Sequence, residues 1–301
     1  MSALPLDRDP EMGHGSAFGS YVALDEATIA RDARRKVRQR RMLVWLARVA
    51  MLVLIVGGWQ LLTSIKIVDP FFWGRPSGIV RQLNDWVRHG TAYGSIWLQI
   101  WITMKEAVLG FGVGVVTGVV AGVLLGQVRF LAEVFSPYIK VMNAIPRIVL
   151  GSLFTVALGL GVSSKVALAS VLVFFVVFFN AFQGVREVDR NFVANARVLG
   201  ASRLAVTRHV VLPSALTWII ASLHVAFGLA IIGAIVGEFL GAQKGLGLVI
   251  ATAQNNFNPD GVFGAMFIIA ILTLTAEGLI GLLERRLLSW RPRSQIEVGV
   301  V

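Results

Sequence analysis

The chain has 301 residues, of which 56% are hydrophobic and 15% are charged, and its formal net charge is +11. Soluble domains carry about 25% charged residues, so this composition excludes an ordinary soluble domain and indicates an integral membrane protein. The positive charge does not indicate a nucleic-acid partner, because the basic residues gather at the ends of apolar runs, where they orient membrane spans. The chain has no cysteine, so disulfides and thiolate sites are also excluded.

The N-terminal segment, 1–41, is expected on the cytoplasmic side. Residues 1–24 mix glycine, proline, aspartate and serine without apolar periodicity, which predicts disorder. Residues 25–41 are expected to form a helix, with seven basic residues between Arg31 and Arg41 that anionic headgroups would attract. We favour a positive-inside anchor over a regulatory segment as the role of this helix.

Six apolar runs predict an all-α membrane domain over 42–290, because a helix needs about 20 apolar residues to cross a bilayer. Two short helices are expected between spans, at 77–88 and 246–254. The C-terminal tail, 291–301, follows a cluster of arginines and is expected in the cytoplasm, like the N-terminus. The six predicted spans are 42–62, a span within 96–127, 131–158, 165–182, 218–240 and 262–283.

A glycine repeat marks the second predicted span. The glycines recur at every fourth residue, so they lie on one helical face and leave a strip without side chains. Such a strip lets another helix approach closely, and we expect it to serve helix packing and not binding. The five glycines are Gly110, Gly114, Gly118, Gly122 and Gly126.

Polar residues within the predicted spans are the candidates for a substrate pathway. In the third span, Pro146 is expected to kink the helix and Arg147 follows it directly. Arg147 would attract an anion, or else pair inside the bundle or reach the interface. Asn143, Asn180 and His224 either line the pathway or form hydrogen bonds between helices. Glu238, at the outer end of the fifth span, either gates the pathway or caps the interface.

The longest polar interval inside the apolar body is 186–215, which carries five arginines and predicts a cytoplasmic loop. Gly200 and Pro213 divide it into two predicted helical pieces, one ending near Gly200 and one over 202–212. A loop that carries its own helices is expected to bind a partner.

This interval resembles the EAA loop of permease subunits of ABC importers. The matching positions are Ala196, Gly200, Val210, Leu212 and Pro213. The sequence differs from the pattern at Ala194, where the family has Glu, and at Asn195, where it has Ala.

The resemblance extends over about 70–286. The stretches AIPR, GASR, which contains Gly200, Ala201 and Ser202, VVLPSA and GEFLGAQKGLG resemble permeases of the nitrate, sulfonate and taurine branch. This resemblance implies a six-helix bundle like that of type I ABC importer permeases, in the bacterial inner membrane.

The resemblance also implies a mechanism and partners. Residues 196–213 would couple the chain to a cytoplasmic ATPase dimer that holds ATP and Mg²⁺, and this chain itself would carry no cofactor. A second permease copy, as a homodimer, and a periplasmic or lipid-anchored solute-binding protein would complete the importer. The solute would be small and anionic, such as nitrate, a sulfonate or taurine.

No enzymatic motif supports another function. The sequence has no G-x-x-x-x-G-K-[ST] phosphate loop, no G-x-S-x-G elbow and no histidine pair with metal-ligand spacing. The chain is therefore expected not to be an enzyme. A secondary transporter or channel working without an ATPase is the alternative, but it would usually show intramembrane acidic residues or an inverted repeat. The sequence does not name the solute, which the binding protein would select.

Overall fold

The computed structural model describes residues 14–287. The predicted C-terminal tail, 291–301, lies outside these residues, as do the side chains of 14–35, Arg129, Asn143 and Arg190. The chain divides into two compact units, Met1–Ile65 and Lys66–Val301. Each unit is described by itself.

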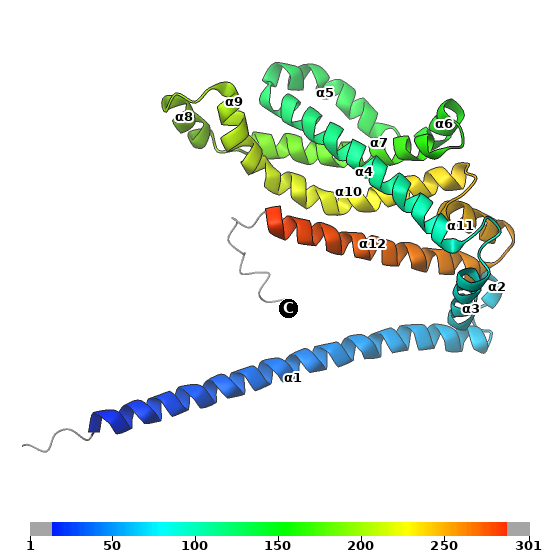
Figure 1. Cartoon of the computed structure of the whole chain (residues 1–301), viewed down its shortest axis with the longest axis horizontal. Coiled ribbons are helices and arrows are strands. Elements are labelled where there is room, and N and C mark those ends of the chain that lie inside the picture. Colours follow the sequence, from blue (N-terminus) through cyan, green and yellow to red (C-terminus); the bar gives the residue numbers. More distant parts are fainter. Residues whose placement is uncertain (1–13, 288–301) are drawn as a thin grey trace, which may run out of the picture. The chain divides into compact units, whose positions relative to one another are not determined.

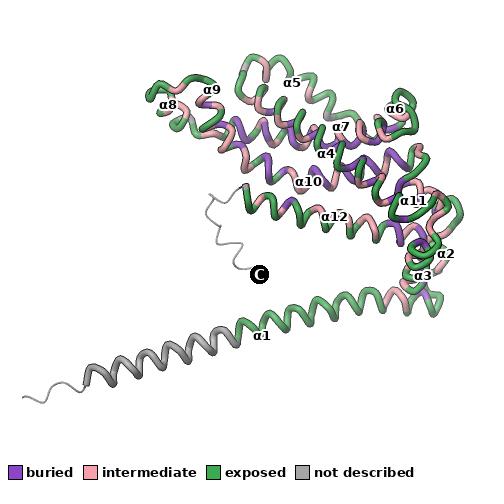
Figure 2. Tube along the Cα trace, viewed as in Figure 1, coloured by how far each residue is buried: buried purple, intermediate pink, exposed green. Residues whose placement is uncertain are grey.

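The first unit is a single long helix, α1 (His14–Ser64). Its segment Lys36–Ser64 is long and apolar enough to cross a membrane, and it contains the predicted first span. The helix begins at His14, so part of the segment expected to be disordered is helical. The side chains along most of the apolar segment are exposed, as Figure 2 shows, and this surface is suited to lipid or to a partner helix.

The second unit is helical through its described part, apart from turns and one isolated bridge, Thr91–Gly94. Predictions of helices at 77–88 and 246–254 are confirmed by α3 and α11. The elements are α2 (Pro70–Trp73), α3 (Pro76–Arg88), α4 (Ile96–Gln127), α5 (Arg129–Ala144), α6 (Val149–Leu158), α7 (Val162–Arg186), α8 (Arg190–Val198), α9 (Arg203–Val206), the π-helical turn η1 (Thr207–Val211), α10 (Leu212–Leu240), α11 (Leu246–Asn255) and α12 (Pro259–Leu287).

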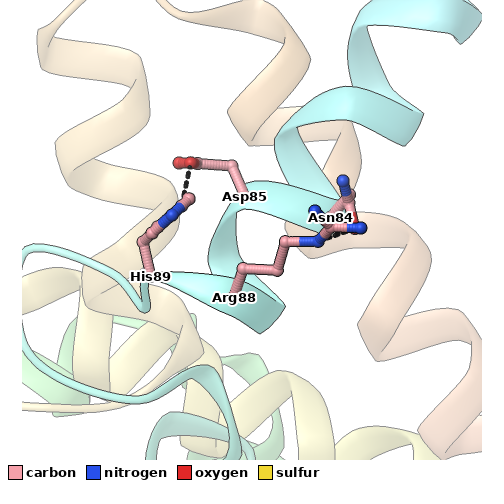
Figure 3. A network of polar contacts seen from close by, with 4 residues as sticks. All are labelled: Asn84, Asp85, Arg88 and His89. Carbon is pink, nitrogen blue, oxygen red and sulfur yellow. Dashed lines mark hydrogen bonds and ion pairs between the residues drawn. The ribbon is translucent and has the colours of Figure 1, made fainter.

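Within this unit, α7 packs against both α4 and α10, and α10 also packs against α12. Figure 1 shows α8 and α9 at one end of these long helices, with α11, α2 and α3 at the other. The helix α3 is amphipathic: Trp86 is buried against α11 and α12, while polar side chains cover the other face. On that face Arg88 Nε donates to Asn84 Oδ1 at 3.0 Å, and Asp85 pairs with His89 at 2.8 Å (Figure 3). This helix therefore suits the boundary between the bundle and water.

The glycine strip of α4 lies against α7. A Cβ added at Gly114 would lie 2.6 Å from Val173 Cβ, and one at Gly122 would lie 2.7 Å from Ala181 Cβ. Real Cβ atoms do not approach this closely, so the observed helix spacing depends on the missing side chains. The seam borders a core that is completely closed to solvent at Ala107, Val173 and Val177.

The third predicted span is not one continuous helix. It is divided into α5 and α6 by the segment 145–148. Ile145 is extended (φ −70°, ψ 127°), because the residue before a proline avoids the helical region, and Pro146 has no N–H with which to continue the helix. Five helical segments of the described residues are long and apolar enough to span: α1, α4, α7, α12 and the continuous run Arg203–Leu240.

That continuous run also corrects the prediction for the polar loop. The second helical piece was expected to end near Leu212, before a separate fifth span, yet α9, η1 and α10 follow one another without a break. The reason is the π-helical turn before Pro213, in which Leu212 N donates to Thr207 O, five residues back. A wider turn of this kind accommodates the proline inside the helix.

We expect Gly114→Ala to destabilise the bundle, because the new methyl group overlaps Val173 across the seam. Overpacking of this kind typically costs about 1–3 kcal/mol. The matched control is Gly112→Ala on the same helix, where the added Cβ has no neighbour within 4 Å. Thermal unfolding of the purified protein measures both variants. Equal melting temperatures for the two would contradict the seam.

Candidate functional site

The turn between α8 and α9 is defined by the backbone of Gly200. Ala201 N donates to Ala196 O and Gly200 N donates to Arg197 O, both at 3.0 Å. This pair of bonds is the Schellman helix ending, which requires a left-handed residue after the helix. Gly200 supplies it with φ +83°, a value that glycine adopts without steric cost. The position of this glycine therefore has a structural cause.

A new helix begins directly after that turn. Ser202 Oγ accepts a hydrogen bond from Ala205 N at 3.2 Å and so caps α9. Ala196, Ala201 and Val210 pack, partly buried, against the core cluster that includes Val211 and Ala215. Leu212 and Pro213, the first two residues of α10, are half-buried. The segment 186–215 is thus a helix–turn–helix fixed to the bundle at its base.

The outer face of this helix–turn–helix is apolar and exposed. Val198 and Leu199, at the end of α8, are 86% and 87% exposed, and Phe192 and Leu204 are 63% and 77% exposed. Ala194, where the EAA pattern has Glu, is exposed as well. Exposed apolar side chains gathered on a short polar segment mark an interaction surface. We call these four residues, Phe192, Val198, Leu199 and Leu204, the coupling surface.

The opposite end of the bundle contains a buried polar cluster centred on Glu238 of α10. Its side chain is completely buried. Thr103 Oγ1 of α4 donates to Glu238 Oε1 at 2.7 Å, and Gly247 N donates to Glu238 Oε2 at 2.6 Å. Leu246 N in turn donates to Thr103 Oγ1 at 2.8 Å. These bonds fasten the start of α11 to α4 and α10.

Two further polar residues extend the attachment of α11. Gln99 Oε1 accepts from Gly245 N at 2.7 Å, while Gln99 Nε2 donates to Tyr93 O at 2.9 Å. Gly245 has φ +120°, and a Cβ there would overlap the Glu238 carboxylate. The glycines of GAQKGLG therefore allow the backbone to approach the buried carboxylate closely.

Lys165 of α7 and Glu106 of α4 complete the cluster. Lys165 is 1% exposed and its ammonium donates to the carbonyls of Leu160 and Gly241 and to Ser164 Oγ. Glu106 is 2% exposed, and its carboxyl group interacts with Glu238 and with the charge of Lys165. Charged residues inside a membrane bundle pair with one another or with backbone carbonyls, and the Lys165 ammonium does the latter.

The comparisons with known proteins agree on one family. Residues 114–289 match the family described as binding-protein-dependent transport system inner membrane component. The chain is 33% identical to the riboflavin transport system permease protein RibX of Chloroflexus aurantiacus, over 79% of this chain and 88% of RibX. It is 32% identical to the putative aliphatic sulfonates transport permease protein SsuC of Escherichia coli, over 85% of this chain and 97% of SsuC. The chain belongs to this family of transport permeases.

The fold of the permease agrees with solved relatives. It superimposes on a chain of the MetNI methionine ABC transporter, in a structure titled as inward-facing, with a TM-score of 0.57 and 20% identity. The superposition covers 64% of this chain and 97% of that chain. Together with the family match, this superposition confirms the predicted ABC importer permease bundle in an inner membrane. The comparisons do not support the alternative of a secondary transporter or channel.

The four predicted pathway residues whose side chains the structure describes do not meet at one site of the permease. Arg147 lies in the break between α5 and α6, with its guanidinium 4.5 Å from the ring centroid of Phe175. Asn180 Nδ2 donates to Val176 O in its own helix at 2.9 Å. His224 pairs with Glu284 of α12 at 3.1 Å, and Glu238 belongs to the buried cluster. The Asn143 side chain lies outside the described part of the structure.

The buried polar cluster was largely missed in the sequence. Of its members, only Glu238 was singled out from the sequence, as a gate of the pathway or a cap at the interface. The available signal was the spacing of Gln99, Thr103 and Glu106, which lie at i, i+4 and i+7 and so share one face of a largely apolar helix. An acidic residue at this depth in a span favours a partner from another helix.

Replacing Thr103 by valine should release α11 from the bundle, because it leaves the buried Leu246 N–H and one Glu238 oxygen without their partner. Each such unsatisfied group costs about 1–3 kcal/mol. We expect faster hydrogen exchange at the amides of Leu246–Asn255, measured by mass spectrometry. The control is Thr117→Val in the same helix, where the hydroxyl donates to Val113 O in its own helix. Unchanged exchange in the Thr103 variant would show that the cluster does not hold α11.

Proposed function

We propose that this permease couples solute import to a cytoplasmic ATPase through the segment 186–215. The supporting observation is the coupling surface: four apolar side chains are exposed on short helices that are themselves fixed to the bundle. A lone apolar residue on a surface needs no explanation, but a group held rigidly at the end of a bundle suits a groove on a partner. The coupling residues are Ala196, Gly200, Ala201, Ser202, Val210, Leu212 and Pro213, which shape and anchor this surface.

The connection to the bundle is suited to carrying force. From Arg203 to Leu240 the helix is continuous, so a displacement at α9 is passed directly into α10. Thr207 Oγ1 also donates to Gln127 Oε1 at the end of α4, at 2.8 Å, which joins the segment to a second long helix. ATP binding, with Mg²⁺, would close two ATPase subunits and draw two such segments together. The permease would then change between inward-facing and outward-facing states by rigid-body motion.

The complete importer would contain a second copy of this permease, an ATPase dimer and a solute-binding protein. The arginines of 186–215 would orient the α8–α9 end toward the cytoplasm under the positive-inside rule, and we propose that both termini lie on the same side. The binding protein would then deliver solute at the α11 end. ATP and Mg²⁺ would bind to the ATPase, and this chain would carry no cofactor.

The solute is proposed to be a small anion. The relatives named for aliphatic sulfonates and taurine support an anionic solute, and Arg147 provides a cation at the break between α5 and α6. A half-buried guanidinium beside an irregular stretch of backbone is the arrangement expected where a pathway is wet. Asn143, Asn180, His224 and Glu238 remain further candidates along that pathway.

Gly200→Val tests the coupling segment. A branched side chain is strained at φ +83°, so the variant should rearrange the turn and lose ATPase binding or uncouple ATP hydrolysis from uptake. The measurement is recovery of the ATPase with tagged permease, followed by ATP hydrolysis and uptake in proteoliposomes. We expect at least a tenfold loss of uptake per ATP hydrolysed, or loss of the complex.

The control is Gly159→Val, because Gly159 has nearly the same backbone angle, φ +79°, and likewise no neighbour within 4 Å of an added Cβ. It ends α6, at a distance along the chain from the coupling segment. The Gly159 variant should suffer the same local strain yet retain ATPase binding. Normal uptake and normal complex recovery with Gly200→Val would refute the proposal.

A further inference from the structure

A cleft of about 430 Å³ lies between α5 and α7, a volume suited to a small ligand. One wall is made by Phe178, Phe179 and Phe182 of α7, and the other by Ser136 and its neighbours on α5. Arg186, the last residue of α7 on the way to α8, also lines the cleft. Of the predicted pathway residues whose side chains the structure describes, Arg147, Asn180, His224 and Glu238, none lines this cleft.

The aromatic wall belongs to a longer stripe along α7. Phe174, Phe178 and Phe182 are stacked in sequence, with centroid distances of 5.6 and 6.0 Å and interplanar angles of 14° and 26°. Phe179 joins the stripe by an edge contact with Phe178 at 5.3 Å. Residues four apart share a helical face, so α7 presents a continuous surface of rings to α5.

Cations stand at both ends of this stripe. The Arg186 guanidinium lies 5.2 Å from the Phe182 centroid, and that of Arg147 lies 4.5 Å from the Phe175 centroid. Lys140 of α5 also lines the cleft and is exposed, as is Glu133. In the described part of the chain no ion pair joins Glu133 to Lys140 or Arg186. The cleft therefore offers two cations and one carboxylate, a net positive charge of one.

We propose that this cleft is a solute-binding site of the import pathway, and that it selects monovalent anions carrying an aromatic ring, such as an aromatic sulfonate or carboxylate. The inference rests on the proposed import function and names its substrate class. Lys140 and Arg186 would bind the anionic group, and the ring would stack against Phe178, Phe179 and Phe182. Ser136 can donate a further hydrogen bond to the anion.

The aromatic wall is the reason for choosing this class over small oxyanions. Nitrate, or an alkyl sulfonate such as taurine, can use the cations but has no ring to stack on three phenyl groups. Aromatic pairs gain free energy beyond that of simple burial, and this gain is available only to a solute that has a ring. The Arg186–Phe182 pair holds one of the two cations in place over the wall, so this part of the site is preorganised.

The test uses the full permease–ATPase complex in phosphatidylcholine vesicles and measures equilibrium binding of radiolabelled p-toluenesulfonate, taurine and nitrate. We expect p-toluenesulfonate to bind at least tenfold more tightly than the other two. Lys140→Met and Phe179→Ala should each weaken its binding roughly tenfold, through loss of the charge and of the ring contact respectively. The matched controls are Arg88→Met on α3 and Phe130→Ala, an exposed ring on α5 that does not line the cleft.

Equal binding of the three anions, or unchanged binding in both cleft variants, would overturn the inference. So would competition by phosphatidylglycerol that abolishes p-toluenesulfonate binding, since the cleft would then be a site for anionic lipid. ATP hydrolysis stimulated by the binding protein is measured on the same complexes. If that stimulation is intact while aromatic anions do not bind, the substrate class is wrong and the proposed coupling function stands.

Discussion

The close approach of α4 to α7 is the contact on which the rest of the structure depends. Ala169 of α7 is completely buried between two glycines, Gly110 of α4 on one side and Gly233 of α10 on the other. Lipid provides no hydrophobic force to drive helices together, so such bundles depend on tight packing of small residues. Because α4 and α10 lie this close to α7, only backbone atoms and small side chains of α7 fit on the two faces that meet them.

That packing determines what the third face of α7 can do. The faces toward α4 and α10 carry Ala169, Val173, Val177 and Ala181, and so the large rings are confined to the side that meets α5 and α6. On this side the break at Pro146 interrupts the helical cover and brings Arg147 to Phe175. The helix α7 is therefore both the central helix between α4 and α10 and one wall of the cleft.

The sequence was sufficient to predict those structural features that depend only on residues near one another in the chain. The spans follow from hydropathy, and the turn at Gly200 follows from the residue that a Schellman ending needs. Pro146 was predicted to kink the third span, but it divides the span completely, because Ile145 before it is extended and Pro146 has no N–H with which to continue the helix. The continuous α9–α10 helix was missed because a proline ordinarily ends a helix, and the π-helical turn that accommodates Pro213 has no simple sequence signal.

Contacts between distant residues were harder to predict. Thr103 and Glu238 are 135 positions apart, and their hydrogen bond depends on how α4 and α10 cross. The periodic phenylalanines of FFVVFFNAF are present in the sequence, but they predicted no site. Without the neighbouring helix, however, a ring stripe in a span is equally suited to lipid. The cations that distinguish a binding cleft are Lys140 of α5 and Arg186 at the end of α7.

The two ends of the bundle are held by different chemistry, and this bears on how it can move. At the α11 end the buried carboxylate of Glu238 joins α4, α10 and α11, while Lys165 joins α7 to the end of α10. At the other end Thr207 joins the α9–α10 helix to α4. Because α4, α7 and α10 are fixed to one another at both ends and along the glycine seam, they must move together as one body. In the proposed coupling, a displacement at the coupling surface would be carried through these three helices, and the segment left to change shape would be the one interrupted at Pro146.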